Sequence, residues 1–433
     1  MARKMKDSGI EWIGEIPEGW DVIPAKFLFK KSDMRRIADD EQLTASQQFG
    51  IISQKDYTEL TGSKVVLANK GLEDWKHVEP FDFIISLRSF QGGLEMSEIT
   101  GCITWHYIVL KPCHKICSYY YKWLFKSDSY IRALQRTCSF IRDGQDLRYS
   151  NFIQVPLFEP PLAEQEKIAD YLNAECFRID TMLTKTRSSI EEYKKLKQAV
   201  ITQAVTKGVR GEREMKPTDF TRWSEIPFDW GLKRVKSCIA SISSGLSAIT
   251  DDANSEESGK FVLRTSAVSS GFFVHTEVKP VLKSAVNRLI CPVEPDTLIV
   301  SRMNTASMVG ACAYVANNHP NTFLPDKLWK IKFLPSYHTK YMWYALNSVP
   351  AKSWFSELAT GASSSMQNIS INDFTSNYLP IPAFSEQKEI ADYLDAKCAE
   401  IDKLVVKKEQ LVKELESYKK SLIYEVVTGK REV

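Results

Sequence analysis

The stretch EQEKIADYL (164–172) recurs as EQKEIADYL (386–394), and this repetition decides the fold. Extended to 17 residues, the two copies are identical at eleven positions and lie 222 residues apart. An earlier pair, EIPEGW (15–20) and EIPFDW (225–230), lies 210 residues apart, so the sequences between these matches differ in length. A repeat this long exceeds the 20–50 residues of a solenoid unit. It predicts a duplicated domain, with each copy followed by a helix.

Each copy is predicted to end in one long helix, over residues 164–207 and 386–428. Neither segment contains Pro or Gly, and its apolar residues recur at alternating spacings of three and four, which makes one stripe. A stripe this long predicts that the two helices pair as a coiled coil. The alternative is that each helix lies on its own globular domain. The residues predicted to form the helix-pair interface are Ile168, Leu172, Ile179, Leu183, Ile390, Leu394, Ile401, Leu404, Leu411 and Leu415.

The regions between the repeated ends are predicted to mix strands and helices. Runs rich in β-branched and aromatic residues indicate strands, and in each half an aromatic-rich stretch that favours a helix follows them. Those aromatic residues are more typical of a core than of a base-stacking platform. The strand-like runs are FDFIISL (81–87), ITWHYIVL (103–110), DTLIVS (296–301) and LWKIKF (328–333), and the helical stretches are residues 118–136 and 337–349.

Two polar loops in each half are candidate DNA-reading segments. One follows a strand-like run, at 85–93 and 299–310, and the other precedes the repeated frame, at 139–152 and 359–374. Arg, Gln and Asn side chains can form paired hydrogen bonds with base edges. For any single residue, an ordinary polar surface loop is the competing interpretation. The candidate DNA-binding residues are Arg88, Ser89, Gln91, Arg142, Gln145, Arg148, Arg302, Asn304, Ser365, Gln367 and Asn368.

Composition and motifs argue against several functional classes. The 433-residue chain has a net charge of +3, ordinary hydrophobic and charged fractions, no run long enough to span a membrane and no secretory signal. Its nine scattered cysteines fit reduced thiols in a cytoplasm. No glycine-rich phosphate loop, methyltransferase motif or nuclease motif is found, and no catalytic residues are assigned. CHKIC (113–117) matches no common metal-site spacing, so no metal ligands and no cofactor are assigned.

The chain resembles the specificity subunits (HsdS) of type I restriction-modification systems. The residues that carry this resemblance are SGIEWIGEIPEGW (8–20), PPLAEQEKIADYLN (160–173) and IPAFSEQKEIADYLD (381–395), and the loops SLRSFQGG (86–93) and MQNISINDF (366–374) are also typical. The match covers essentially the whole chain. One departure is the second opening, TRWSEIPFDW, which lacks the full WIG form.

The resemblance implies an α+β fold: two similar α/β target-recognition domains separated by two long helices that form an antiparallel coiled coil, as a pseudo-twofold tandem repeat. The expected boundaries are 1–150 and 209–372 for the two target-recognition domains, and 151–208 and 373–433 for the two conserved spacer helices.

The resemblance also implies a function. Each variable domain would read one half of a bipartite site in double-stranded DNA, and the helices would dock two modification (methyltransferase) subunits, which carry the adenine-methylating site and bind S-adenosylmethionine. Motor-nuclease subunits would complete the restriction complex. The chain itself would be a non-catalytic, cytoplasmic subunit. The alternatives are a coiled-coil scaffold with two ligand-binding domains and a single-chain enzyme with an unrecognised site.

Overall fold

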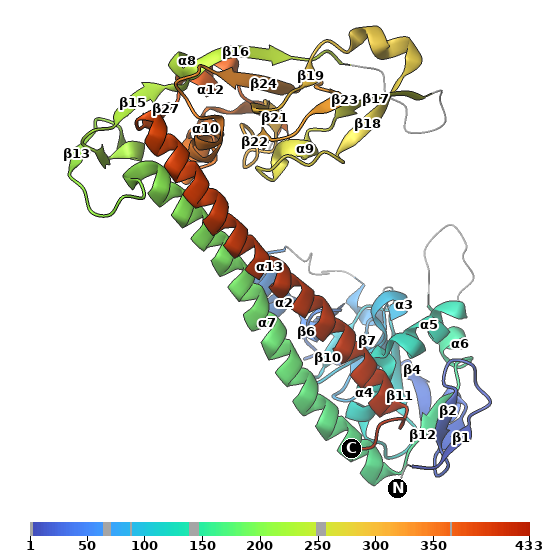
Figure 1. Ribbon diagram of the computed structural model, residues 1–433. Coiled ribbons are helices and arrows are strands. Elements are labelled where there is room, and N and C mark those ends of the chain that lie inside the picture. The colour runs from blue at the N-terminus through green and yellow to red at the C-terminus, as the bar shows by residue number, and fades with distance from the viewer. Residues whose placement is uncertain (1–2, 64–70, 87–88, 138–146, 248–256, 364–365) are drawn as a thin grey trace. The chain divides into compact units, whose positions relative to one another are not determined.

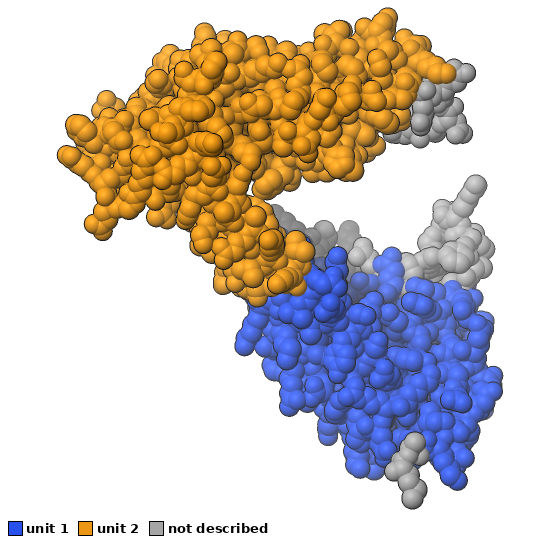
Figure 2. Space-filling model, in the orientation of Figure 1, with its two compact units in different colours: residues 1–187, 409–433 blue, residues 188–408 orange. Residues whose placement is uncertain are grey.

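The computed structural model describes residues 3–63, 71–86, 89–137, 147–247, 257–363 and 366–433 (Figure 1). The chain forms two compact units. Unit 1 comprises Met1–Arg187 and Glu409–Val433, and unit 2 comprises Ser188–Lys408 (Figure 2). Each long helix contributes one segment to each unit. No described helix combines the length and apolar character needed to cross a membrane.

The two long helices are α7 (Leu162–Lys207) and α13 (Phe384–Val427), of 46 and 44 residues. They begin within two residues of the predicted positions, directly after proline-containing turns, because the residue before a proline is disfavoured in a helix. Both end at a glycine in the left-handed region, Gly208 with φ of 77° and Gly429 with φ of 70°. Only glycine adopts this backbone conformation without strain, so these two residues end the helices.

The helices run antiparallel, and the same ion pair links them in each unit. In unit 1, Lys419 Nζ binds both carboxylate oxygens of Asp180 on α7, at 2.6 and 2.7 Å. In unit 2, Lys197 on α7 binds Asp402 on α13, at 2.7 and 2.6 Å. Asp402 is the repeat equivalent of Asp180, and Lys419 that of Lys197, both at the offset of 222. The pair therefore recurs with the roles of the two helices exchanged.

Most of the predicted apolar stripe is buried, but it does more than join the helices. Ile168 and Leu172 pack in one cluster with Trp20 and Phe158 of the domain that precedes α7. In unit 2, the corresponding turns of α13 join that unit's core in the same way. The early turns of each helix thus lie on a domain, as the alternative proposed, while charged contacts also pair the helices. The buried members of the stripe are Ile168, Leu172, Ile179, Leu183, Ile390, Leu394 and Ile401.

Two predicted interface residues are exposed instead. Leu404 is 37% and Leu411 42% exposed, whereas Leu415 is half-buried against the core of unit 1. Beyond Ile401 the less exposed positions continue at Val405, four residues on, and not at Leu404, three residues on. Leu404 and Leu411 are one heptad apart and so share this exposed side of the helix.

A four-stranded antiparallel sheet forms the centre of unit 1. Its strand order is β4 (Phe29–Ser32), β11 (Ile108–Pro112), β8 (Phe83–Ile85), β9 (Glu95–Met96). The predicted strand 103–110 is interrupted by a turn at 105–107, so its two ends belong to different sheets. The remaining elements of unit 1 are the pairs β1 (Met5–Asp7) with β2 (Glu15–Pro17), β3 (Asp21–Ile23) with β12 (Leu157–Glu159), β5 (Leu43–Ser46) with β6 (Gly50–Ser53) and β7 (Lys76–Val78) with β10 (Gly101–Ile103); the helices α1 (Ala25–Leu28), α2 (Gln54–Thr61), α3 (Ser89–Gly92), α4 (Ser118–Lys126), α5 (Asp128–Arg136) and α6 (Tyr149–Phe152); and the 3₁₀ turn Leu72–Asp74.

Unit 2 repeats this sheet with the same connectivity. Its order is β16 (Ile239–Ser244), β24 (Leu328–Phe333), β20 (Thr297–Ser301), β22 (Cys312–Val315). Every residue of β20 is buried, which explains its unbroken apolar run. The other elements are β13 (Met215–Pro217) with β14 (Glu225–Pro227); β15 (Gly231–Arg234) with β27 (Tyr378–Ile381); β17 (Glu257–Leu263), β18 (Val278–Leu282), β19 (Pro292–Val293) and β23 (His319–Phe323) in a second sheet; β21 (Met303–Asn304), β26 (Met366–Asn368) and β25 (Thr360–Ser363) in a third; the helices α8 (Val235–Cys238), α9 (Ser266–Ser269), α10 (Thr339–Leu346), α11 (Val349–Leu358) and α12 (Ile371–Ser376); and the 3₁₀ turns Thr221–Trp223 and Lys283–Arg288.

These matching elements confirm the prediction of two similar α/β domains. Each begins with a short hairpin, β1–β2 or β13–β14. In each, the last strand of the domain pairs with an early strand, β12 with β3 in unit 1 and β27 with β15 in unit 2. The aromatic residues of the predicted helical stretches lie in the cores, as expected. The stretch 118–136 forms two helices, because Ser127 ends α4 and caps α5 through its side chain.

The Glu-Gln pair at the start of each long helix makes the same contacts in both units, which explains why the motif occurs twice. Gln165 Nε2 donates to the carbonyl of Pro160 at 2.8 Å, and its Oε1 accepts from the backbone N–H of Cys117 at 2.9 Å. Gln387 makes the equivalent bonds, to Pro382 at 3.0 Å and from His338 at 2.8 Å. One glutamine side chain therefore joins the turn before each long helix to the start of α4 or α10.

The glutamate of the same motif binds the tryptophan that opens each domain. Trp20 Nε1 donates to Glu164 at 2.9 Å, and Trp230 Nε1 donates to Glu386 at 3.1 Å. An arginine, Arg3 or Arg213, forms an ion pair with the same carboxylate. The two sequence matches that define the repeat, the opening Ile-Pro-Trp segment and the helix start, are thus parts of one contact made in each unit.

Candidate nucleic-acid interface

The two polar loops chosen separately in the second half are neighbours in unit 2. Strand β21, in the loop 299–310, pairs antiparallel with β26, in the loop 359–374, so that Met303 lies opposite Asn368 and Asn304 opposite Gln367. The backbone N–H of Ile369 donates to the carbonyl of Arg302 at 2.9 Å. Asn304, Gln367 and Asn368 therefore lie on two adjacent strands, with Arg302 directly before β21, and each of these four candidates is partly exposed.

Two polar side-chain atoms of this strand pair and the residue before it have no hydrogen-bond partner among the described residues. They are Nε of Arg302 and Oδ1 of Asn368, and both are buried. Buried polar atoms in folded proteins are nearly always paired, so an unpaired donor and an unpaired acceptor here call for an explanation. Guanidinium and amide groups form paired hydrogen bonds with guanine and adenine edges, respectively. A small rearrangement of these two side chains on binding would expose the chemistry that base reading requires.

Asn304 has a different environment from its neighbours. Its Nδ2 donates to Ser269 Oγ at 2.9 Å, and its Oδ1 accepts from the backbone N–H of Thr305 at 2.9 Å. Both ends of the amide are therefore engaged inside the protein. This geometry gives Asn304 a positioning role, tying β21 to the end of α9.

A cleft of about 390 Å³ near this strand pair contains basic residues that the sequence reasoning missed. Arg264, Lys279 and Lys327 line it together with one acid, Asp326. The carbonyl of Lys327 accepts from the backbone N–H of Arg302 at 3.1 Å, which places the cleft beside the candidate strands. Arg264 could have been chosen as a candidate by the same criterion as Arg302, because each arginine directly follows a strand. Such cationic side chains bind phosphate groups and position DNA without reading its sequence.

In unit 1 the structure describes three of the candidate residues. Ser89 is 1% exposed, and its hydroxyl accepts from the backbone N–H of Ser86 at 2.8 Å, so it supports the turn before α3 and does not present its side chain to a ligand. Gln91 lies on α3 and is exposed. Arg148, also exposed, is the residue that precedes α6. Gln91 and Arg148 stay predictions as exposed candidates, whereas the side chain of Ser89 is buried.

Four candidates lie outside the described residues: Arg88, Arg142, Gln145 and Ser365. Their roles stay predictions. They adjoin described candidates in both units, since Arg88 precedes α3 and Ser365 precedes β26.

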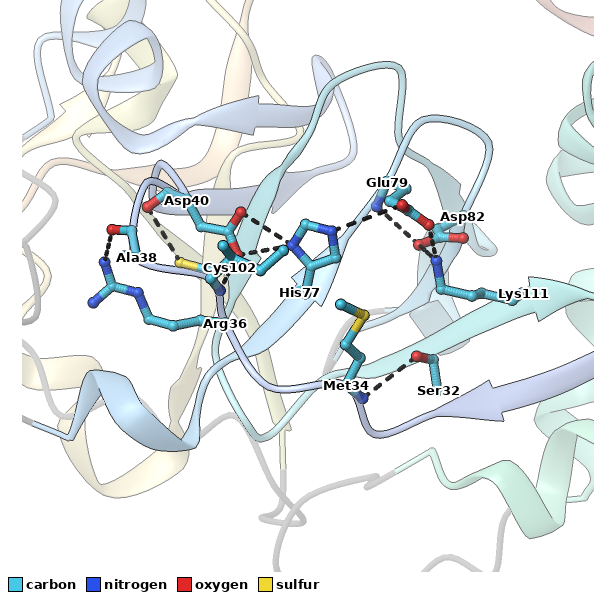
Figure 3. Close-up of polar contacts among 11 residues, drawn as sticks. Ser32, Met34, Arg36, Ala38, Asp40, His77, Glu79, Asp82, Cys102 and Lys111 are labelled. Carbon is cyan, nitrogen blue, oxygen red and sulfur yellow. Dashed lines mark hydrogen bonds and ion pairs between the residues drawn. The ribbon is translucent and has the colours of Figure 1, made fainter.

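Unit 1 also contains a buried polar network around His77 and Lys111 (Figure 3). His77 Nδ1 lies 2.8 and 3.0 Å from the carboxylate oxygens of Asp40, and Lys111 forms ion pairs with Glu79 and Asp82. The side chains of His77 and Asp40 are each 4% exposed, which leaves no access for a substrate. Burial raises the pKa of Asp82, and the hydrogen bond from Lys111 lowers that of Glu79. The network joins β7, β11 and the segment that precedes β5, and its role is structural.

The described residues contain no cluster of three or more His, Cys, Asp or Glu side chains arranged to hold a metal. The segment CHKIC has structural contacts instead. His114 Nε2 lies 2.6 Å from Glu159, and the backbone N–H of Cys117 is bound by Gln165.

Comparisons with known proteins find similar sequences and a family model that matches part of the chain. The family described as "Type I restriction modification DNA specificity domain" matches residues 229–414. The chain is 22% identical over 397 residues to the type I restriction enzyme EcoKI specificity subunit of Escherichia coli, which covers 87% of this chain and 82% of that protein. It is 24% identical over 286 residues to a putative type I restriction enzyme MjaX specificity subunit of Methanocaldococcus jannaschii, which covers 64% of this chain and 59% of that protein.

Two solved structures share the fold along nearly the whole chain. One comes from work on complex assembly and conformational transition of the type I restriction-modification system, with a TM-score of 0.69, 14% identity and coverage of 95% of this chain and 98% of that one. The other is the HsdS subunit of Thermoanaerobacter tengcongensis, with a TM-score of 0.52, 14% identity and coverage of 96% and 98%.

Proposed function

We propose that the chain is a specificity subunit of a type I restriction-modification system, because it is similar to such subunits in sequence along most of its length and has their fold. Each unit reads one half of a bipartite site in double-stranded DNA, and the helix pair docks two methyltransferase subunits. The chain contributes no catalytic group. The partner subunits supply the methyl transfer and bind S-adenosylmethionine, and the complex works in the cytoplasm, with motor-nuclease subunits added for restriction.

One observation carries the proposal of bipartite reading. The two units share their sheet order and their helix-start contacts, but the residues of their polar loops differ. Unit 2 presents Arg302 directly before β21 and Asn368 on the paired strand β26, whereas unit 1 presents Gln91 and Arg148 on or beside two short helices. Two domains that recognise different DNA sequences need the same fold but different residues in the loops that contact the bases.

Methylation mapping tests this proposal. DNA from cells that express the chain with its methyltransferase partner is sequenced for modified adenines, and a split, asymmetric motif is expected. Arg302→Ala should relax one base position of one half-site, because a paired contact to a base contributes about 1–3 kcal/mol of discrimination. Arg234→Ala, on β15 of the same unit, is the control and should leave the motif unchanged. If Arg302→Ala and Asn368→Ala both leave it unchanged, β21 and β26 are not the reading elements.

The docking proposal rests on exposed apolar residues that recur on the helices. Met182 and Leu404 are repeat equivalents at the offset of 222, as are Leu196 and Tyr418, and all four are exposed. Unit 1 contains Met182 on α7 and Tyr418 on α13, and unit 2 contains Leu196 on α7 and Leu404 on α13. Two identical partners need the same surface twice, and exposed apolar residues at equivalent positions supply one in each unit.

Single and double substitutions test the docking proposal. Met182→Asp and Leu404→Asp should each reduce the number of bound methyltransferase subunits from two to one, and the double variant should bind none, as measured by native mass spectrometry of the co-expressed complex. Lys403→Asp places a carboxylate on a neighbouring exposed position and is the control. Full occupancy in the double variant would rule out these positions as the docking surface.

The helices are also proposed to set the distance between the half-sites. A heptad adds about 10 Å of helix while keeping the stripe in phase. Because the helices pair, seven residues must be inserted in both, after Glu191 in α7 and after Glu409 in α13, near the contact of Lys408 with Tyr193. We expect a spacer longer by about one to three base pairs, since a base pair rises about 3.4 Å and rotation around the duplex opposes part of the change. An unchanged spacer in an active complex would contradict this role.

A further inference from the structure

Unit 2 contains a cavity of about 340 Å³ between the helix pair and helices α10 and α11. Aromatic rings of Phe272, Trp343 and Tyr344 form part of its wall, and Ile401 and Val405 of α13 form another part. A volume of this size lies within the range of small-molecule sites, which combine mainly apolar walls with a few polar groups. The polar groups in this wall are Lys194, Lys197, Gln198, Asn347, Lys352 and Asp402.

Lys352 is the cation in this cavity that lacks a partner. Lys197 binds Asp402, and Lys194 binds Glu191 at 2.9 Å. Among the described residues, no carboxylate forms an ion pair with Lys352, and burial lowers the pKa of its ammonium group. A partly buried cation without a carboxylate partner is less favourable than a paired one, so this position favours an anionic group.

Two amide oxygens in the cavity wall also lack partners. Asn347 is 7% exposed, and its Nδ2 donates to the carbonyls of Cys312 at 2.9 Å and Trp343 at 3.1 Å. These bonds fix the orientation of the amide, so the oxygen is the unpaired end. Its Oδ1 and the Oε1 of Gln198 are both buried without a donor among the described residues. The cavity thus contains two orphaned acceptors as well as one orphaned cation.

The equivalent cleft of unit 1 provides an internal comparison. It has a volume of about 690 Å³ and lies against Asp180 and Lys419, the repeat equivalents of Asp402 and Lys197. Each lysine and arginine in its wall forms an ion pair with a carboxylate. These pairs are Lys122 with Glu98, Lys126 with Glu95, Arg187 with Glu416, Lys419 with Asp180 and Lys420 with Asp128. The unpaired cation is therefore particular to unit 2 and is not a consequence of the shared frame.

We propose that the cavity of unit 2 binds a small planar heteroaromatic molecule that bears an anionic group, of the class of nucleoside monophosphates. The ammonium group of Lys352 binds the phosphate by charge-assisted hydrogen bonds. The heterocycle packs against the aromatic wall, where offset or edge-to-face contacts are favoured. The two hydrogens of the exocyclic amino group donate to the amide oxygens of Asn347 and Gln198. Each orphaned group of the cavity thereby gains a partner of the chemistry it lacks.

Calorimetric titration of the full chain with adenosine monophosphate, adenosine and inorganic phosphate tests the proposal. Saturable binding of one nucleotide per chain is expected, with much weaker binding of the nucleoside or phosphate alone, because each satisfies only part of the site. Lys352→Met, which keeps the length of the side chain but removes its charge, should weaken nucleotide binding by about ten- to a hundredfold. Lys122→Met, in the cleft of unit 1, should leave it unchanged.

A second variant separates recognition of the heterocycle from recognition of the phosphate. Gln198→Leu removes one acceptor and should weaken binding of the nucleotide and the nucleoside by a similar factor, whereas Lys352→Met should affect only the nucleotide. Circular dichroism and thermal unfolding verify that each variant is folded. Absence of saturable binding by all three probes to the folded wild-type chain would overturn the proposal. So would equal affinities for the wild type and Lys352→Met, or a loss of binding in Lys122→Met.

Discussion

Glu164 and Glu386 occupy the same position at the starts of the two long helices but differ in burial, so the same substitution can be made at both and its effects compared. Glu386 accepts from Trp230 and pairs with Arg213, and its side chain is 2% exposed. Glu164 accepts from Trp20 and pairs with Arg3, but its side chain is 25% exposed. The tryptophan and arginine contacts are equivalent, although Glu386 also lies 3.9 Å from Arg210, so the two alanine substitutions should cost different amounts of stability, mainly because of burial.

The structure gives a magnitude for each substitution. Removing one member of a buried ion pair costs about 3–5 kcal/mol when the other charge is stranded. Arg213 retains two contacts with Asp229, each at 3.1 Å, so Glu386→Ala should cost about 3 kcal/mol, at the lower end of this range. For Glu164→Ala, water replaces the exposed ion pair, which contributes about 0–1 kcal/mol, and the Trp20 indole loses one hydrogen bond of about 1 kcal/mol. We therefore expect a cost of about 1–2 kcal/mol in unit 1.

Hydrogen exchange resolved by peptide measures the two effects separately, because each unit can open on its own. Amides in the first two turns of α13 should lose more protection in Glu386→Ala than those of α7 lose in Glu164→Ala. Glu389→Ala serves as the control, since Glu389 forms an exposed ion pair with Arg210 in the same region. Equal losses in the two glutamate variants would refute the reasoning from burial. A loss for Glu389→Ala as large as that for Glu386→Ala would do the same.

Three further predictions follow from single sites. Burial lowers the pKa of Lys352 below 10.5, so between the lowered pKa and 10.5 the unfolded state binds more protons than the folded state, and stability rises with pH across that window. Lys352→Met should therefore raise the melting temperature at pH 7. The increase should shrink as the pH approaches 10.5. Alkylation followed by peptide mass spectrometry should modify Cys113, which is exposed, before Cys312, which is buried and whose pKa burial raises to about 12; equal rates would contradict the buried environment. Gly310 has a φ of 76°, and a Cβ there would lie 2.7 Å from the ring of Phe355, so Gly310→Ala should lower the free energy of unfolding by about 1–3 kcal/mol in urea denaturation, and a wild-type midpoint would contradict the close contact.

The repeat and the long helices could be anticipated from the sequence, whereas the meeting of the two loops in unit 2 could not. Periodicity and breakers are local signals, and the Pro and Gly residues around α7 and α13 fixed both ends within two residues. The choice between Leu404 and Val405 could not be made in this way. Both are apolar, they lie three and four residues beyond Ile401, and either continues the stripe. Packing against the partner helix decides between them, and that is a tertiary property.

In the candidate site, too, the sequence gives the chemistry of each side chain but not its surroundings in the fold. Arg302 and Asn368 were selected for their side-chain chemistry, and pairing of β21 with β26 places them together. Ser89 had suitable chemistry too, but its hydroxyl supports the turn before α3. Nothing in the sequence distinguishes a serine that caps a turn from one that faces a ligand. Lys352 illustrates the converse, because a lysine in the first turn of a helix looks solvated until the packing shows it desolvated.

The duplication itself supplies a rule for sorting these features. In a tandem repeat whose two helices run antiparallel, each contact of the shared frame occurs twice, with the helices exchanging roles, as Asp180 with Lys419 and Lys197 with Asp402 demonstrate. A feature that occurs at both equivalent places therefore belongs to the frame or to partners that bind both units. A feature that occurs once must serve what distinguishes the units. By this rule the apolar positions Met182 and Leu404 belong with docking. The paired strands around Arg302 and the unpaired lysine of the unit 2 cavity belong instead with recognition specific to that unit.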